Sequence, residues 1–156
     1  MNFNIPTPAQ TLDISMDDGA IIRLRRHSAG ERRLLLSHGN GFAIDAYYPL
    51  WRLFLDDFEV VVFDVRNHGQ NLRHDLASHH INRFVLDFET IHARIPEAFG
   101  AKPTVAVFHS ISAITGLLQN LEYGQRWDAL LAVDPSLMPE PGHALYQNAH
   151  AFELKL

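Results

Sequence analysis

The segment spanning residues 104–113, TVAVFHSISA, constrains the fold more than any other part of the chain. Its first residues form a short apolar run rich in β-branched side chains, which predicts a buried strand, and a helical pattern begins directly after the serine at position 110. Ser110 is therefore expected at a strand-to-helix corner, where the first amides of the helix point at whatever the serine contacts. Such a corner is a natural place for a nucleophile.

Strands and helices alternate along the rest of the chain. An antiparallel hairpin is predicted for residues 11–16 and 20–27, because Asp17, Asp18 and Gly19 between them form a turn signal. Near-continuous apolar runs, typical of strands buried on both faces of a parallel sheet, occupy residues 34–37, 60–65 and 129–133. Helical periodicity covers residues 45–57, 80–99 and 111–122. The pattern predicts an α/β fold, a doubly wound and mostly parallel sheet with right-handed crossovers.

Composition narrows the function classes. The 156 residues are 47% hydrophobic and 20% charged, enough for one domain with a real core, and the net charge of −5 without a long basic run argues against nucleic acid as a partner. The absence of cysteine rules out disulfides and thiolate metal sites. The N-terminus lacks the pattern of a signal peptide, and no apolar run approaches the length of a membrane span. We expect a cytoplasmic protein without a metal, a membrane partner or an organic cofactor.

Three segments together resemble the N-terminal half of the α/β-hydrolase family. They are LLLSHGNGF at residues 34–42, DVRNHGQN at residues 64–71, and the corner at residues 104–113. In that family the glycine turn after the third strand donates one oxyanion amide, a related turn follows the fourth strand, and the nucleophile elbow follows the fifth. Order and spacing agree from about residue 11 to about residue 136, and nothing corresponds to the family's later strands.

The resemblance implies a set of site residues. Ser110 would be the nucleophile, and the amides of Asn40 and Ile111 would form the oxyanion hole. Asp134, at the end of the sixth predicted strand, is a weaker candidate for the catalytic acid, because an Asp-Pro pair there is more often a strand terminator with a structural carboxylate. Phe42, with Tyr47 and Trp51, indicates an apolar wall near the oxyanion turn and hence an apolar acyl substrate.

One position departs from the family pattern. Phe108 stands two residues before Ser110, where the elbow usually has glycine because strand and helix backbones approach closely there. Either the Phe108 side chain turns into a gap opened by small neighbours, or the corner is relaxed and the serine less exposed. Ser112 and Ala113, by contrast, satisfy the requirement for small residues after the nucleophile.

The histidine of a catalytic triad is not identified in this sequence. His38 and His109 resemble structural histidines of the family, His68 belongs to the turn after the fourth strand, and His79-His80 lacks a zinc-binding pattern. In the family the catalytic histidine lies beyond the last residue of this chain. We therefore expect residues 1–138 to be the N-terminal part of a hydrolase core and residues 139–156 to begin a cap. The missing histidine would come from the C-terminal portion of the same enzyme or from a partner chain.

Three functions follow from these observations. The first is a serine hydrolase that cleaves ester or related acyl bonds, of which this chain is an incomplete portion that we expect to be inactive on its own. The second is a non-catalytic module with a hydrolase-like fold that self-associates or binds another chain through its open sheet edge. The third, haloalkane or epoxide chemistry on the same fold, conflicts with Ser110, because those relatives use an aspartate nucleophile.

Overall fold

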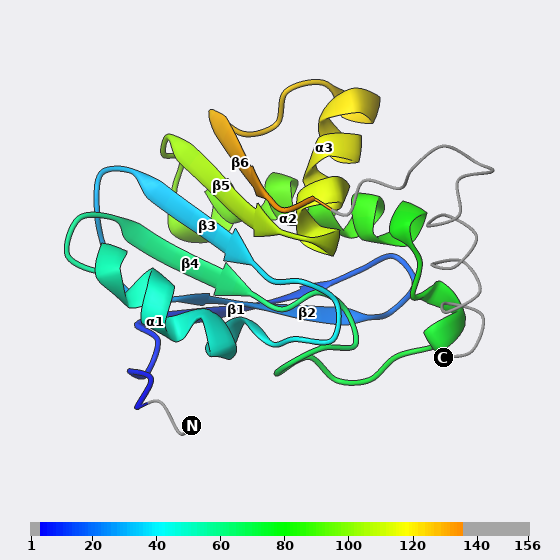
Figure 1. Cartoon of the computed structure of the whole chain (residues 1–156), viewed down its shortest axis with the longest axis horizontal. Helices are drawn as coiled ribbons and strands as arrows, with labels where there is room; N and C mark the ends of the chain where they lie inside the picture. The colour runs from blue at the N-terminus through cyan, green and yellow to red at the C-terminus, as the bar shows by residue number, and fades with distance from the viewer. Residues whose placement is uncertain (1–3, 136–156) are drawn as a thin grey trace.

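The computed structural model describes residues 4–135, and in it a single six-stranded sheet has the order β1-β2-β4-β3-β5-β6 (Figure 1). The strands are β1 (Gln10–Ser15), β2 (Ile21–Arg26), β3 (Arg33–Ser37), β4 (Glu59–Phe63), β5 (Thr104–His109) and β6 (Ala129–Val133). The hairpin β1–β2 is antiparallel and β2 pairs antiparallel to β4, whereas β4, β3, β5 and β6 run parallel. The predicted α/β sheet is confirmed.

The two long helices cover one face of the sheet. Helices α2 (Ile81–Phe99) and α3 (Ile111–Tyr123) pack on one face, as predicted from their apolar periodicity. Every residue of β3 and β4 is buried, because these strands lie in the middle of the sheet with a hydrophobic cluster on each side. A third helical segment, η3 (Leu76–Ser78), follows the loop after β4.

The helix predicted for residues 45–57 is broken into short pieces. The structure has η1 (Ile44–Tyr47), α1 (Tyr48–Trp51) and η2 (Arg52–Phe54) in its place. Pro49 explains the break, because proline has no amide hydrogen to continue a helical ladder and is tolerated only in a first turn. Trp51 is fully buried and its indole donates to the carbonyl of Ile44. It is therefore a core residue beneath the sheet and does not contribute accessible surface to the apolar wall that the sequence predicted.

Strained backbone is concentrated at one end of the parallel strands. Within residues 4–135 the non-glycine residues with positive φ are Asn67 (64°), Ser110 (52°) and Asp134 (43°). They follow β4, β5 and β6 respectively, so all three lie beyond the carboxyl end of a parallel strand. Such conformations persist only where the surroundings impose them, and they often mark functional sites.

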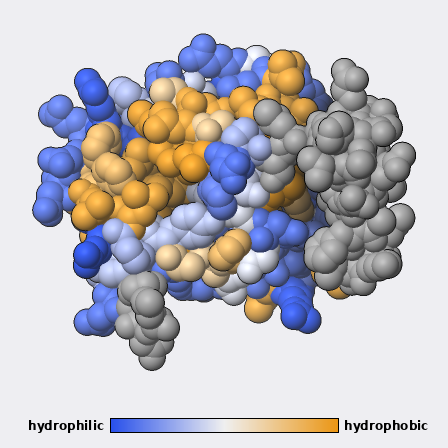
Figure 2. Space-filling view, viewed as in Figure 1, coloured by the Kyte–Doolittle hydropathy of each residue, from blue (hydrophilic) through white to orange (hydrophobic). Residues whose placement is uncertain are grey.

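The face of the sheet that carries α1 is only partly covered. Figure 2 shows hydrophobic surface extending over this face. Its exposed apolar side chains include Leu131 and Val133 of β6, which are 52% and 46% accessible, together with Leu50 and Leu53 beside α1. β6 is also the edge of the described sheet. The predicted cap at residues 139–156 lies outside the described residues. No helix within residues 4–135 is long and apolar enough to span a bilayer.

Candidate active site

Ser110 occupies a tight corner between β5 and α3. Its φ and ψ of 52° and −114° are far from those of a helix or a strand. The Ser110 amide donates to the carbonyl of Val133 on β6 at 3.0 Å, and its carbonyl accepts from the amide of Ile114 at 3.1 Å. Neighbouring elements thus hold the corner on both sides, and the expected strand-to-helix corner is present.

The Phe108 side chain is accommodated without relaxing this corner. It is fully buried, and its ring packs edge-on against Phe63, Phe88 and Trp127. Space for it is left by Gly116 on α3, where an added Cβ would lie only 2.8 Å from the Phe108 ring. The first alternative is confirmed: the Phe108 side chain turns into a gap left by a small neighbour, since Gly116 of α3 has no side chain at the position that the ring fills.

The turn after β3 lies directly against the elbow. A Cβ added at Gly39 would lie 3.0 Å from the Cβ of Ser110 and 2.8 Å from Nδ1 of His109, so only glycine permits this approach. A second link comes from α3, where the buried Ser112 hydroxyl donates to the carbonyl of His38 at 2.6 Å. The two segments singled out in the sequence, about 70 residues apart, are therefore brought into contact.

Most amides of this turn are already engaged in hydrogen bonds. The Gly39 amide donates to the Tyr47 hydroxyl at 3.3 Å, the Gly41 amide to Nε2 of His68 at 3.1 Å, and the Phe42 amide to the Gly39 carbonyl at 3.2 Å. Within residues 4–135, the Asn40 amide donates to no other group. The hydrogen bonds of the turn thus leave the Asn40 amide unused among the described residues.

Tyr47 and His109 support the turn from the side of β5. The Tyr47 hydroxyl, which accepts from Gly39, also lies 2.6 Å from Nδ1 of His109. Phe42 packs edge-on against the Tyr47 ring and remains 55% exposed. The sequence suggested only an apolar wall here, but Tyr47 has a polar role as well. A small apolar hollow of about 60 Å³ opens beside Tyr47 and His109, bounded by Val107 and Val133.

Asp64, which the sequence analysis did not single out, organises the turns after β3 and β4. Its buried carboxylate accepts from the amides of Ile44 and Gln70 at 2.7 and 3.2 Å. A Cβ at Gly69 would fall within 2.3 Å of this carboxylate, so glycine is needed at that position. Burial by itself raises the pKa of Asp64, but the adjacent His38 ring and the two amides outweigh it and hold the pKa below 3.8.

The other predicted site residues lie at the same end of the sheet. Ile111 begins α3, and its amide is one of the first amides of that helix, which have no partner within the helix itself. Asp134 is exposed and follows Val133, whose carbonyl holds the Ser110 amide. Among residues 4–135, no hydrogen bond or ion pair reaches the Asp134 carboxylate. The sequence favoured a structural carboxylate here over the catalytic acid, and both roles of Asp134 stay predictions.

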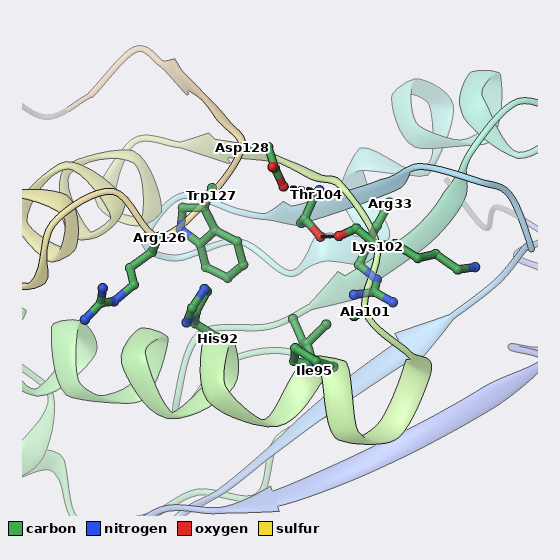
Figure 3. A pocket seen from close by; sticks show the side chains of 10 residues that line it. Arg33, His92, Ile95, Ala101, Lys102, Thr104, Arg126, Trp127 and Asp128 are labelled. Atoms are coloured by element: carbon green, nitrogen blue, oxygen red, sulfur yellow. Dashed lines mark hydrogen bonds between the residues drawn. The ribbon is translucent and has the colours of Figure 1, made fainter.

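A larger hollow, of about 120 Å³, lies at the opposite end of the strands (Figure 3). Its walls come from α2 and from residues next to β3, β5 and β6, with His92 packed edge-on against Trp127. The cationic side chains that line it already have carboxylate partners: Arg33 and Lys102 pair with Glu59, and Arg126 pairs with Glu89. Its cationic side chains therefore offer an anionic ligand no uncompensated positive charge.

Comparison with known proteins agrees with this geometry. A family described as serine aminopeptidase, S33, matches residues 29–155. No curated protein matches the chain by sequence.

Solved structures show the same fold at low sequence identity. An N-formylmaleamic acid deformylase from Pseudomonas putida has a TM-score of 0.71 at 19% identity, over 93% of this chain and 56% of its own. A hydrolase from Pseudomonas aeruginosa has a TM-score of 0.71 at 20% identity, over 95% and 54%. An epoxide hydrolase from Vigna radiata has a TM-score of 0.65 at 17% identity, over 86% and 42%. The chain thus spans about half the length of these structures.

Proposed function

The chain belongs to the serine aminopeptidase S33 family of α/β-hydrolases, and on that premise we propose that it is part of a serine hydrolase acting on ester or related acyl bonds. The single observation that carries the proposal is the contact between the strained Ser110 corner and the Gly39 turn. Serine alone would be an ordinary helix N-cap. A serine with positive φ, pressed against a turn that leaves an amide unused, has the requirements of a nucleophile beside an oxyanion hole.

The reaction follows from these groups. Oγ of Ser110 attacks the acyl carbon and transfers its proton to a general base, and the carbonyl oxygen becomes an oxyanion between the amides of Asn40 and Ile111. Collapse expels the alcohol, which receives the proton from the base, and leaves an acyl ester on Ser110. Water then repeats the sequence and releases the acid.

The general base is proposed to come from outside residues 4–135. The histidines nearest the site have structural partners: His38 contacts the Gly39 carbonyl and the Val65 amide, His68 contacts Gly41, and His109 contacts Tyr47. The sequence places His143 and His150 beyond residue 135, and a second polypeptide is the other source. Asp134 remains the candidate acid on this chain, by its position at the end of β6.

An apolar acyl group is the proposed substrate class. The hollow beside Tyr47 and His109 is lined mainly by aliphatic side chains, and Phe42 adds an exposed aromatic ring next to the oxyanion turn. Burial of alkyl carbons against such surface contributes about 0.8 kcal/mol per CH₂ group, which favours a short aliphatic or aromatic acyl chain.

Labelling with a fluorophosphonate tests the proposal on the full 156-residue chain. The expected result is one phosphonate per chain, located by peptide mapping at Ser110, and none on Ser110→Ala. Ser15→Ala, which removes an exposed serine of β1, is the matched control and should label like wild type. Labelling that survives in Ser110→Ala contradicts the assignment, as does labelling that is absent both from the chain alone and from the chain with any co-purifying polypeptide.

The same assay locates the base. If labelling disappears in His143→Ala or His150→Ala, the base lies on this chain. If both variants label like wild type, and labelling rises on adding a co-purifying polypeptide, the base comes from that second chain. Native mass spectrometry of the same sample identifies such a complex.

A second candidate function is a non-catalytic module that binds through the edge of the sheet. The observation favouring it is the half-exposed Leu131 and Val133 on the edge strand β6, continuous with the apolar surface of Figure 2. Exposed apolar edges commonly pair with another chain. A stable homodimer or heterocomplex that does not react with the fluorophosphonate would favour this function over hydrolysis.

A further inference from the structure

We propose that His68 is a positioning residue, whose neutral imidazole holds the Gly39–Phe42 turn in the shape that presents the Asn40 amide to the substrate. The role of the turn in substrate binding rests on the proposed function, but the hydrogen bond between His68 and Gly41 can be measured without any activity. It concerns a residue that neither contacts the reacting atoms nor belongs to a triad.

The two nitrogens of the His68 ring have different partners. Nδ1 lies 2.9 Å from the carbonyl of Arg66, and Nε2 accepts from the amide of Gly41 at 3.1 Å. A carbonyl requires a donor and an amide requires an acceptor, so the contacts select one neutral tautomer, with the proton on Nδ1. His68 thereby connects the turn after β4 to the turn after β3.

Gly41 is held by this hydrogen bond and by the turn that the Phe42 amide closes on the Gly39 carbonyl. The residue has a φ of +78°, and a Cβ placed there would meet nothing within 4 Å. The side of Gly41 that a side chain would occupy is therefore open, unlike that of Gly39, which faces His109 and Ser110 closely. Asn40 lies between a residue fixed by packing and a residue fixed by His68, and the direction of its amide depends on both.

Protonation of His68 would break its hydrogen bond with the Gly41 amide. With a proton on Nε2, two N–H groups would face each other and the Gly41 amide would lose its acceptor. Burial lowers the pKa of His68 below its usual 6.5, an effect increased by nearby His38 and opposed by the Arg66 carbonyl and Asp64. The centre of the His79 ring lies 5.3 Å from that of His68, and burial lowers the pKa of His79 as well. The turn is therefore intact at neutral pH and loses its anchor as pH falls below 6.5 through the lowered pKa.

Other ionisable groups also lie near the turn. Asp64 has a pKa below 3.8 and stays ionised until strongly acidic pH. Arg66 carries its charge throughout. Two further histidines contact the turn at Gly39: Nδ1 of His38 lies 2.7 Å from the Gly39 carbonyl, and Nδ1 of His109 lies 2.6 Å from the Tyr47 hydroxyl that holds the Gly39 amide. Within residues 4–135 the contact to the Gly41 amide is that of His68, so the His68 variants separate its titration from theirs.

The direct test is nitrogen NMR on the labelled full-length chain. The expected result is an Nδ1-protonated neutral His68 at pH 7.5, and a Gly41 amide resonance that moves with the His68 titration. In His68→Gln, whose side-chain oxygen can replace Nε2 as acceptor, the Gly41 resonance should stay near its neutral position at every pH between 5 and 8. A His68 protonated on Nε2 at neutral pH, or a Gly41 amide indifferent to the His68 titration, overturns the proposal.

A second measurement connects the turn to the oxyanion hole. Phenylboronic acid forms a tetrahedral adduct with an activated serine and places an oxygen in the oxyanion hole. Affinity in wild type should fall about tenfold when His68 protonates, consistent with partial loss of one oxyanion donor. His68→Gln should remove this step of the pH profile, whereas His68→Leu should bind weakly at all pH values. His74→Gln is the control. It changes a half-buried histidine whose Nε2 lies 3.9 Å from the Asp18 carboxylate, and boronate binding should keep the wild-type pH profile.

The two measurements separate the possible failures. Boronate binding that is independent of His68 protonation overturns the positioning role, even if Gly41 senses the titration. If wild type forms no adduct at Ser110 while the NMR signature is present, the proposed function fails, and the contact between His68 and the turn stands. If His68→Leu is unfolded by circular dichroism, the comparison of wild type with His68→Gln still decides the question.

Discussion

The two ends of the parallel strands use buried polar groups in opposite ways. At the amino end, Glu59 is fully buried and pairs with Arg33 at 2.6 Å and Lys102 at 2.7 Å. No non-glycine residue with positive φ lies at that end within residues 4–135. At the carboxyl end, three strands each continue into such a residue, and the amides around Ser110 are only partly paired internally.

The amino end of the strands contributes to stability, and the carboxyl end provides the groups for the proposed chemistry. Charges that neutralise each other in the interior fix the sheet but offer nothing to a ligand, which explains why the larger hollow at the amino end is a poor candidate site. Strained backbone and unused donors cost stability and supply a binding site for a developing charge. Variants at each end should therefore affect stability and labelling separately.

Glu59→Gln should have the largest effect. It leaves the buried Arg33 guanidinium without a counter-charge, and breaking a buried pair in this way costs about 3–5 kcal/mol of unfolding free energy. Urea denaturation followed by circular dichroism measures the loss. Glu97→Gln, which breaks the exposed pair with Arg94, should change stability by less than about 1 kcal/mol. Equal effects of the two variants would show that the charges at the amino end do not have the role assigned to them.

Gly116→Ala should have an intermediate effect. The added Cβ would lie 2.8 Å from the Phe108 ring, and such overpacking costs about 1–3 kcal/mol. Combining it with Phe108→Leu should restore part of the loss, because the smaller side chain frees the space that the methyl group needs. A double-mutant cycle by thermal or urea unfolding measures the coupling. Strictly additive effects would mean that Phe108 is not accommodated by the glycine.

Ser110→Gly should have the smallest effect and the opposite sign. Glycine adopts positive φ without the steric penalty of a side chain, so the variant should gain about 1 kcal/mol of stability while losing fluorophosphonate labelling. Ser110→Ala is the control, since it removes the hydroxyl but retains the Cβ. It should lose labelling without gaining stability. If glycine and alanine at this position are equally stable, the corner stores no strain.

Much of the fold could be predicted because the signals are local. The hairpin, the buried strands and helices α2 and α3 were placed by apolar periodicity and turn residues, which depend on neighbours within a few positions. The segment after the Gly39 turn was misjudged because Tyr48, Trp51 and Phe54 share a helical spacing whether or not the helix is continuous. Pro49 is a helix-breaking signal in the sequence, but only the structure shows that a new short helix begins around it.

The backbone features of the candidate site could be predicted from the sequence, but the side chains that hold them in place could not. The corner at Ser110 and the turn at Asn40 are sequence patterns, although their catalytic roles remain predictions. Asp64, Tyr47 and His68 act through contacts with residues 20 or more positions away or across two turns. The motif at residues 64–71 was visible in the sequence, but nothing in it indicates which atoms its side chains reach.

The sequence by itself determined the alternation of strands and helices, the family, and the position of the serine corner, since each follows from short-range pattern and spacing. Only the tertiary structure decided that Phe108 is compatible with that corner, that the Gly39 turn lies against Ser110, and that His68 and Tyr47 hold its amides. These outcomes depend on steric fit and hydrogen-bond direction between segments distant in the chain. Such relations exist only once the sheet has brought the ends of its strands together.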